Sequence, residues 1–280
     1  MSRIAILALL LWCSACGTPA PKAETPAAQG RLAEAEARAA ALVRSGDYAS
    51  AAHKYDEALR LAASVENADA IAANAVNLSI VYQWLGRLSD ARDALSVVVD
   101  DSRRSFSERR RLQAELRRAI LDLAARNNDG AAQWAQRAQA RCAALSCEYA
   151  ATILNLQAQL ALESGRGEEA SRLAQGAVER ARARADIAET ANGLRTLGRA
   201  RRSQGDAATA IPVLEQALEL DRTLADPRKI LADLTELSRA AAAAGDRQAA
   251  RDYAERALAV SRAFNDARGV AEMEAQLRRP

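Results

Sequence analysis

The stretch Ser45–Leu59, SGDYASAAHKYDEAL, decides the fold because its small residues return along the chain at an almost constant interval. Ala51 is the first of six alanines that are separated by 40, 40, 39, 40 and 40 residues. The six are Ala51, Ala91, Ala131, Ala170, Ala210 and Ala250. Seven residues after each of them stands another small or β-branched residue, which in this stretch is Ala58. Such a fixed period, with small residues at constant offsets, predicts stacked helical hairpins.

A turn lies five residues before each alanine and is expected to separate the two helices of a hairpin. Five of the six turns hold a glycine, which can adopt the left-handed conformation that ends a helix. Three of these glycines are followed by an aspartate that is expected to cap the next helix, at Asp47, Asp206 and Asp246. The third turn has Arg126 in place of the glycine. We therefore expect irregular geometry at this turn or at the later connection between Cys142 and Cys147.

Helix starts are predicted at three further points. Ser105 with Glu108 and Asp186 with Glu189 have the spacing of a capping box, in which the first residue accepts from the backbone of the second. Asp226 stands before a proline, which suits the first position of a helix.

Small residues also stand seven positions before each turn glycine position, at Ala39, Ser79, Ala119, Ala158, Gly198 and Ser238. The combined spacing, carried best by Ser45–Leu59 and Gln204–Ala210, resembles the tetratricopeptide repeat in a long variant of about 40 residues. The resemblance implies an all-α protein, in which residues 31–280 form a right-handed α-solenoid of six hairpins and a C-terminal capping helix. Another α-solenoid, of the HEAT or armadillo kind, is the alternative because its repeats have a similar length.

The N-terminus resembles a bacterial lipoprotein signal. The apolar run Ile4–Trp12 is too short to span a bilayer, and Ser14 and Ala15 precede Cys16 as in a lipobox. The resemblance implies a signal peptide of residues 1–15 and a diacylglyceryl group on Cys16. One departure is Cys13, at a position where the family usually has leucine. An ordinary signal peptide cut nearby, or a fortuitous apolar start, is the alternative.

Residues 16–30 are expected to form a flexible tether, because they hold three prolines and small polar residues and have no helical period. In Gram-negative lipoproteins an aspartate after the lipidated cysteine favours retention in the inner membrane, and this chain has Gly17 there. By that analogy we expect the protein to be lipid-anchored at the outer membrane, on its periplasmic face.

Two cysteines remain in the expected solenoid, Cys142 and Cys147. In an oxidising compartment this pair predicts a disulfide across a short connection between hairpins. Free buried thiols are the alternative, and two isolated cysteines are too few for a structural metal site.

The composition points away from catalysis and from nucleic acid. The charges nearly cancel, with 39 basic and 36 acidic residues, and there is no alternation of aromatic and basic residues that would stack bases. His53 is the only histidine and is expected on a helix surface or in hairpin packing. Phosphate loops, zinc-protease motifs and calcium loops do not occur in the sequence. We expect no enzyme activity, no cofactor and no metal.

Candidate binding residues come from the resemblance, which implies that inner-face positions of the first helices line a groove. Those positions hold Asn77, Gln83, Asn155, Gln159, Asn192, Arg195, Arg199, Arg202 and Arg239. Arg195, Arg199 and Arg202 share one helical stripe that would suit a carboxylate or an acidic peptide. The alternative is a solvated arginine face, and the basic pattern of the peptide-carboxylate clamp seen in chaperone-binding relatives is not reproduced.

A second basic cluster runs from Arg103 to Arg118 and includes Glu108 and Glu115. It is expected to be a solvated helix face, or else to approach an acidic partner or anionic headgroups.

These observations favour a lipid-anchored periplasmic scaffold that binds another envelope protein or peptide in its groove. The alternative is a ligand- or glycan-binding sensory or accessory component of a cell-envelope system.

Overall fold

A computed structural model of the chain describes residues 27–144 and 147–278, and the predicted signal peptide and the lipidation site Cys16 lie outside these residues. The described residues form thirteen α-helices and no strand. The helices are α1 (Ala27–Ser45), α2 (Tyr48–Ser64), α3 (Ala68–Trp84), α4 (Leu88–Val99), α5 (Glu108–Ala124), α6 (Asn128–Ala144), α7 (Ala150–Glu163), α8 (Gly167–Ala183), α9 (Ile187–Ser203), α10 (Ala207–Thr223), α11 (Pro227–Ala243), α12 (Arg247–Ala263) and α13 (Ala267–Leu277).

Consecutive helices pair into six hairpins, from α1 with α2 to α11 with α12, and α13 packs on α12 as a cap. The predicted α-solenoid of six hairpins and a capping helix is confirmed. None of the described helices combines the length and the apolar character that crossing a bilayer requires.

The recurring alanines form the tight contacts of the solenoid. Five of the six have no exposed surface: Ala51, Ala91, Ala131, Ala170 and Ala210. The sixth, Ala250, is half-buried because it lies in the last hairpin, where only the short helix α13 follows. At Gly198 a side chain would be too large, since an added Cβ would lie 2.5 Å from Cγ of Leu214. Small residues are therefore required where neighbouring helix axes approach.

The hairpin turns repeat one backbone conformation. The turn glycines have φ between 72° and 84°, and Arg126 adopts the same left-handed region with φ 60°. The expectation of irregular geometry at the third turn is wrong, because Arg126 keeps the turn's backbone hydrogen bonds without a glycine. Side chains cap the following helices as predicted at Asp47, Asp206 and Asp246.

The connection between Cys142 and Cys147, the other place where irregular geometry was expected, includes residues 145–146, which lie outside the described residues. Within the described residues, the loop of residues 100–107 between α4 and α5 is irregular. Arg111 holds this loop by donating to the backbone carbonyls of Val98, Asp101 and Arg104 at 3.2–3.3 Å. The cap of α5 is Ser107, so the predicted capping box at Ser105 is wrong. The predicted caps Asp186 and Asp226 are confirmed.

Helix α1 begins at Ala27, so the last four residues of the predicted tether are helical. Ala27, Ala28 and Gln29 favour helix, and they extend a helix whose buried Leu32 and Ala35 anchor it to the core. The solenoid therefore includes residues 27–30, which were predicted to belong to the tether.

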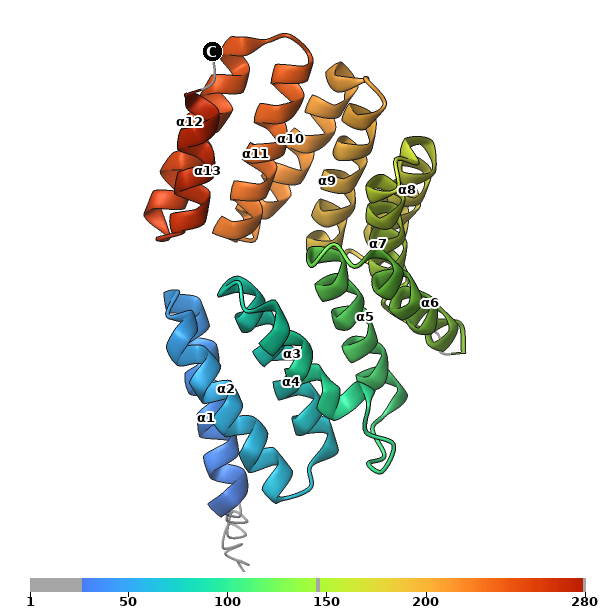
Figure 1. Cartoon of the computed structure of the whole chain (residues 1–280), viewed down its shortest axis with the longest axis vertical. Coiled ribbons are helices and arrows are strands. Elements are labelled where there is room, and N and C mark those ends of the chain that lie inside the picture. The colour runs from blue at the N-terminus through green and yellow to red at the C-terminus, as the bar shows by residue number, and fades with distance from the viewer. Residues whose placement is uncertain (1–26, 145–146, 279–280) are drawn as a thin grey trace, which may run out of the picture.

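The first helices of the hairpins lie on the inside of the curve. Successive first helices from α3 to α11 pack against one another, whereas successive second helices are held apart. The chain bends so far that α1–α3 and α11–α13 come to lie one above the other at the same side of the molecule (Figure 1).

The two ends of the solenoid meet at four side chains, which we call the clasp: Tyr48, Trp84, Arg228 and Phe264. The guanidinium of Arg228 lies 4.4 Å from the ring centre of Tyr48, 5.1 Å from that of Trp84 and 5.5 Å from that of Phe264. Its Nε also donates to the Tyr48 hydroxyl at 3.3 Å, across 180 residues of sequence. Cation–π contacts thus join the first two hairpins to the last one.

Candidate functional site

A groove of about 360 Å³ lies on the inner face, between the first helices α3, α5 and α7. Val76, Leu116 and Ile120 supply apolar wall, and Asn77, Gln113 and Thr152 supply neutral polar groups. These residues recur at the same helical positions because the repeat places equivalent side chains in columns along the solenoid. The groove is therefore lined by side chains at equivalent positions of successive repeats.

Arg117 lies at this groove and is 8% exposed. Its Nε donates to Oγ of Ser79 at 3.0 Å, and its Nη2 donates to the Ser79 carbonyl at 3.0 Å and to Oε1 of Gln83 at 2.6 Å. Among the described residues no carboxylate forms an ion pair with Arg117. Burial lowers the pKa of Arg117 to about 10, so it remains a cation at neutral pH.

A second arginine at the groove is already paired. Arg110 contacts the carboxylate of Asp69 at 3.4 Å and donates to Oε1 of Gln113 at 3.0 Å. Gln113 in turn donates to the hydroxyl of Tyr149 at 2.6 Å. This chain of hydrogen bonds fixes the polar rim of the groove across α5 and the start of α7.

The C-terminal half of the inner face is different, because its cations are neutralised within the chain. Arg195 is only 12% exposed and pairs through Nε with Asp233 at 2.6 Å and through Nη2 with Asp221. Its Nη1 donates to Asn192 at 3.1 Å. Arg195 is therefore occupied by partners from α10 and α11 and is not presented to a ligand.

Asp221 and Asp233 share this one guanidinium, and both carboxylates are buried. Burial raises the pKa of Asp233 to about 7, and the neighbouring Asp221 acts in the same direction, while Arg195 opposes the rise. The two carboxylates would carry two negative charges beside one guanidinium, and this excess of negative charge favours the protonated form of one of them.

The other predicted arginines converge on Glu236 of α11. Arg202 and Arg239 approach it at 3.1 and 2.8 Å and Arg199 at 3.9 Å, while Arg239 also pairs with Glu272 at 2.7 Å. Each arginine of the predicted stripe thus has a carboxylate partner within the chain. The stripe is an ion-pair network that joins successive first helices.

The predicted amides divide in the same way. Asn77 lines the groove, and Gln83 is bound to Arg117 beside it. Asn155 is buried and donates to Glu189 at 3.4 Å, and Asn192 accepts from Lys229 at 2.7 Å, so both belong to the internal network. Gln159 is half-buried on α7. The structure therefore brings the predicted residues together in two groups rather than in one continuous groove.

Sequence reasoning missed the role of Arg117. The same offset that selects Asn77, fourteen residues before Ala91, selects Arg117 before Ala131. Arg117 belongs to the basic cluster that was expected to be a solvated face, and for this residue the expectation is wrong because α3 covers it. The repeat period was the signal that could have distinguished Arg117, at an inner-face position, from the exposed arginines of the same cluster.

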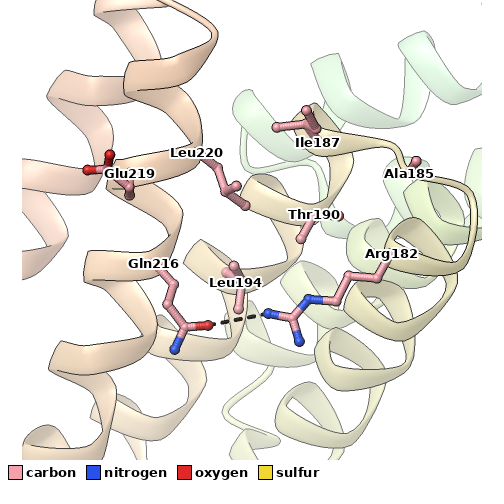
Figure 2. Close-up of a pocket in the computed structure, with 8 residues that line it drawn as sticks. All are labelled: Arg182, Ala185, Ile187, Thr190, Leu194, Gln216, Glu219 and Leu220. Atoms are coloured by element: carbon pink, nitrogen blue, oxygen red, sulfur yellow. Dashed lines mark hydrogen bonds between the residues drawn. The ribbon is translucent and has the colours of Figure 1, made fainter.

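The outer face carries a cavity of about 390 Å³ between α8, α9 and α10. Figure 2 shows Leu194 and Leu220 on its floor and Arg182 facing Gln216 across it, with an Nη2 to Oε1 distance of 3.3 Å. Ile187, at its edge, is 42% exposed. The cavity is apolar and lacks a buried charge that would select a ligand.

The two cysteines of the solenoid are joined as a disulfide, with Cα atoms 5.1 Å apart. The bond links the end of α6 to the segment before α7, so it fixes the connection between the third and fourth hairpins.

His53 is exposed on α2. Within the described residues, no group of three or more histidine, cysteine or acidic side chains is placed to hold a metal ion.

A family model described as tetratricopeptide repeat matches residues 149–223 and 186–263. A comparison with curated proteins finds no match. The recognised repeats therefore lie in the C-terminal part of the solenoid, whereas the groove lies mainly in hairpins that precede them.

Solved structures resemble the whole solenoid. BtubC (BKLC) from P. vanneervenii is 23% identical with a TM-score of 0.55, over 86% of this chain and 94% of its own. A Rap protein complexed with competence and sporulation factor is 15% identical with a TM-score of 0.64, over 89% and 70%. Aspartyl phosphate phosphatase F from Bacillus subtilis is 12% identical with a TM-score of 0.58, over 90% and 79%. At these identities the likeness establishes a tetratricopeptide-like fold.

Proposed function

We propose that this protein is a lipid-anchored periplasmic scaffold that binds a segment of another envelope protein in the groove between α3, α5 and α7. The observation that carries the proposal is the groove itself, which is concave, lies on rigid helices, and combines apolar wall with fixed polar groups. Such a surface suits an extended chain that alternates apolar and hydrogen-bonding groups.

Two further facts support a scaffold. The groove is open along the inner face and is shared by three hairpins, which favours a chain over an enclosed small molecule. A Rap protein of similar fold is complexed with competence and sporulation factor, so a solenoid of this shape can hold such a partner. The polar side chains at the groove include no acid–base pair or nucleophile activated by a base.

The anchor is part of the proposal, and it rests on the sequence around Cys16. Two or three acyl chains on one residue would hold the protein at the membrane surface. Growth with labelled palmitate tests this: wild type is expected to carry the label and Cys16→Ser to lose it. Absence of label in wild type, or equal label in the variant, would refute the anchor while leaving the groove untouched.

Binding is tested by affinity capture of the full chain after crosslinking in cells. The variant Ala73→Trp fills the groove, whereas Ala208→Trp places the same side chain on the exposed surface of α10. A partner that is captured by wild type and by Ala208→Trp, and lost with Ala73→Trp, is the expected result. Equal capture by all three proteins would exclude the groove as the binding surface.

A further inference from the structure

We infer that Arg117 is the centre of a carboxylate subsite in this groove, and that the segment bound there carries an acidic group beside an apolar residue. The inference rests on the proposed function, because it assigns the chemistry of the same groove. It starts from the charge of Arg117, which the chain leaves uncompensated.

Arg117 differs from most other buried charged side chains because it has no ion-pair partner among the described residues. Arg117 is the one cationic side chain among the described residues that is more than nine-tenths buried. Five of the six buried carboxylates among the described residues have an arginine partner within 3.5 Å: Glu115, Asp122, Asp221, Asp233 and Glu236. The sixth, Glu189, accepts from the amides of Asn155 and Asn192. Arg117 has only a hydroxyl, a carbonyl and an amide. Buried charges in proteins are normally paired, so a counterion supplied from outside would stabilise this one.

The hydrogen bonds leave one part of the guanidinium available. Nε and Nη2 donate to Ser79 and Gln83, which hold the plane of the group fixed against α3. Nη1 has no acceptor among the described residues, and it is absent from their fully occluded unsatisfied atoms, so it keeps contact with solvent at the groove. A planar guanidinium held in this way can donate charge-assisted hydrogen bonds to a carboxylate.

The side chains around Arg117 indicate which residue of the bound segment stands beside its acidic group. Leu116, Ile120 and Val76 form apolar wall beside Arg117, and the hydroxyls of Thr152 and Tyr149 lie along the rim. Arg110, the other arginine at the groove, is already paired with Asp69. An acidic residue next to an apolar one fits both the charge and the wall, whereas a basic segment would meet two arginines.

Gln83 provides a minimal way to cancel the charge. Its Oε1 already accepts from Nη2 of Arg117 at 2.6 Å, so Gln83→Glu places a carboxylate on the arginine with almost no change of shape. Arg117→Met removes the charge instead and keeps most of the volume. Arg239→Met is the matched control, because Arg239 lies on the same inner face and already has the partners Glu236 and Glu272.

The test uses the immobilised full chain in detergent and a random pool of hexapeptides that are acetylated at the N-terminus and amidated at the C-terminus. Wild type is expected to enrich Asp and Glu over Asn and Gln by about tenfold, the size expected for a charge-assisted hydrogen bond. Arg239→Met should keep this preference, and both Gln83→Glu and Arg117→Met should lose it. A second pool of hexapeptides, with free C-termini and no acidic side chains, shows whether a C-terminal carboxylate can bind at Arg117 in place of an acidic side chain.

The outcomes separate the two claims. If wild type retains peptides without an acidic preference, or if Gln83→Glu keeps the preference, the carboxylate subsite is wrong and the groove remains a peptide site. If neither pool is retained above an uncoated surface, the proposed function fails and the subsite fails with it. Because Gln83→Glu adds a counterion to a buried cation, the test does not depend on whether Arg117→Met folds.

Discussion

At the scale of single residues, the inner face shows how one side-chain type takes different roles in different surroundings. Arg195 and Arg117 are both largely buried on first helices, but Arg195 has two carboxylate partners and Arg117 has none. The difference comes from residues on neighbouring helices, since α10 and α11 supply acids where α3 supplies an amide. The two arginines stand at adjacent positions of the repeat, fourteen residues before Ala131 and fifteen before Ala210, and their partners differ accordingly.

The missing counterion of Arg117 has a consequence for stability. Gln83→Glu should raise the free energy of unfolding by about 1–2 kcal/mol at neutral pH, because a neutral hydrogen bond becomes a charge-assisted one. Urea denaturation measures the change. Gln216→Glu is the control, since Gln216 accepts from Arg182 on the exposed outer face and should gain at most about 0.5 kcal/mol. Equal effects of the two variants would contradict the account of Arg117.

The carboxylates around Arg195 predict a pH dependence. Burial raises the pKa of Asp233 from 3.8 to about 7, so the folded state binds a proton that the unfolded state releases. The free energy of unfolding should therefore fall as the pH rises from about 4 to about 7. Asp233→Asn, which cannot titrate, should gain stability relative to wild type over this range. Parallel stability curves for the two proteins between pH 4.5 and 8 would show that Asp233 does not carry the proton.

At the scale of helices and hairpins, the small residues of the period decide how closely helices approach. An added Cβ at Gly198 of α9 would meet the side chain of Leu214, whereas one at Gly176 of α8 would meet only Leu154 at 3.7 Å. Gly198→Ala should therefore destabilise the fold by about 1–3 kcal/mol. Gly176→Ala should stabilise it by up to about 1 kcal/mol through helix propensity. Thermal unfolding measures both, and a stabilised Gly198→Ala would contradict the packing argument.

The sequence predicts the hairpins well because the signals are local. Turn glycines, aspartate caps and small residues act within a few residues of themselves, so six hairpins and a capping helix follow from them. The start of α5 was placed wrongly because Ser105 and Ser107 both precede Glu108, and contacts from Arg111 decide between them.

The site is harder to predict, because its charges are settled by residues 26 to 38 positions apart in the sequence. The resemblance to the tetratricopeptide repeat selected Asn77 and Gln83, of which Asn77 lines the groove and Gln83 binds Arg117 beside it. The pairing of Arg195 with Asp221 and Asp233, and of Arg202 with Glu236, depends on packing between helices. A single sequence does not specify these partners.

At the scale of the whole molecule, the clasp is the contact between the two ends of the curved solenoid. Arg228, on α11, contacts Tyr48 and Trp84 of the first two hairpins and Phe264 at the end of α12. We therefore expect the curvature of the inner face to depend in part on the clasp.

Removal of this contact should open the molecule. Arg228→Ala is expected to increase the radius of gyration in small-angle X-ray scattering, while circular dichroism shows unchanged helix content. Arg247→Ala is the control, because Arg247 is an exposed arginine at the start of α12 outside the clasp. Unchanged scattering from Arg228→Ala would mean that the hairpin packing alone sets the curvature.

The central claim is that the inner face between α3, α5 and α7 binds a partner chain. Site-specific photocrosslinking in cells tests it most directly, with benzoylphenylalanine in place of Asn77 at the groove or in place of Gln175 on the exposed surface of α8. We predict that the label at Asn77 crosslinks a discrete partner protein and that the label at Gln175 does not. A partner that crosslinks from Gln175 and not from Asn77 would contradict the account.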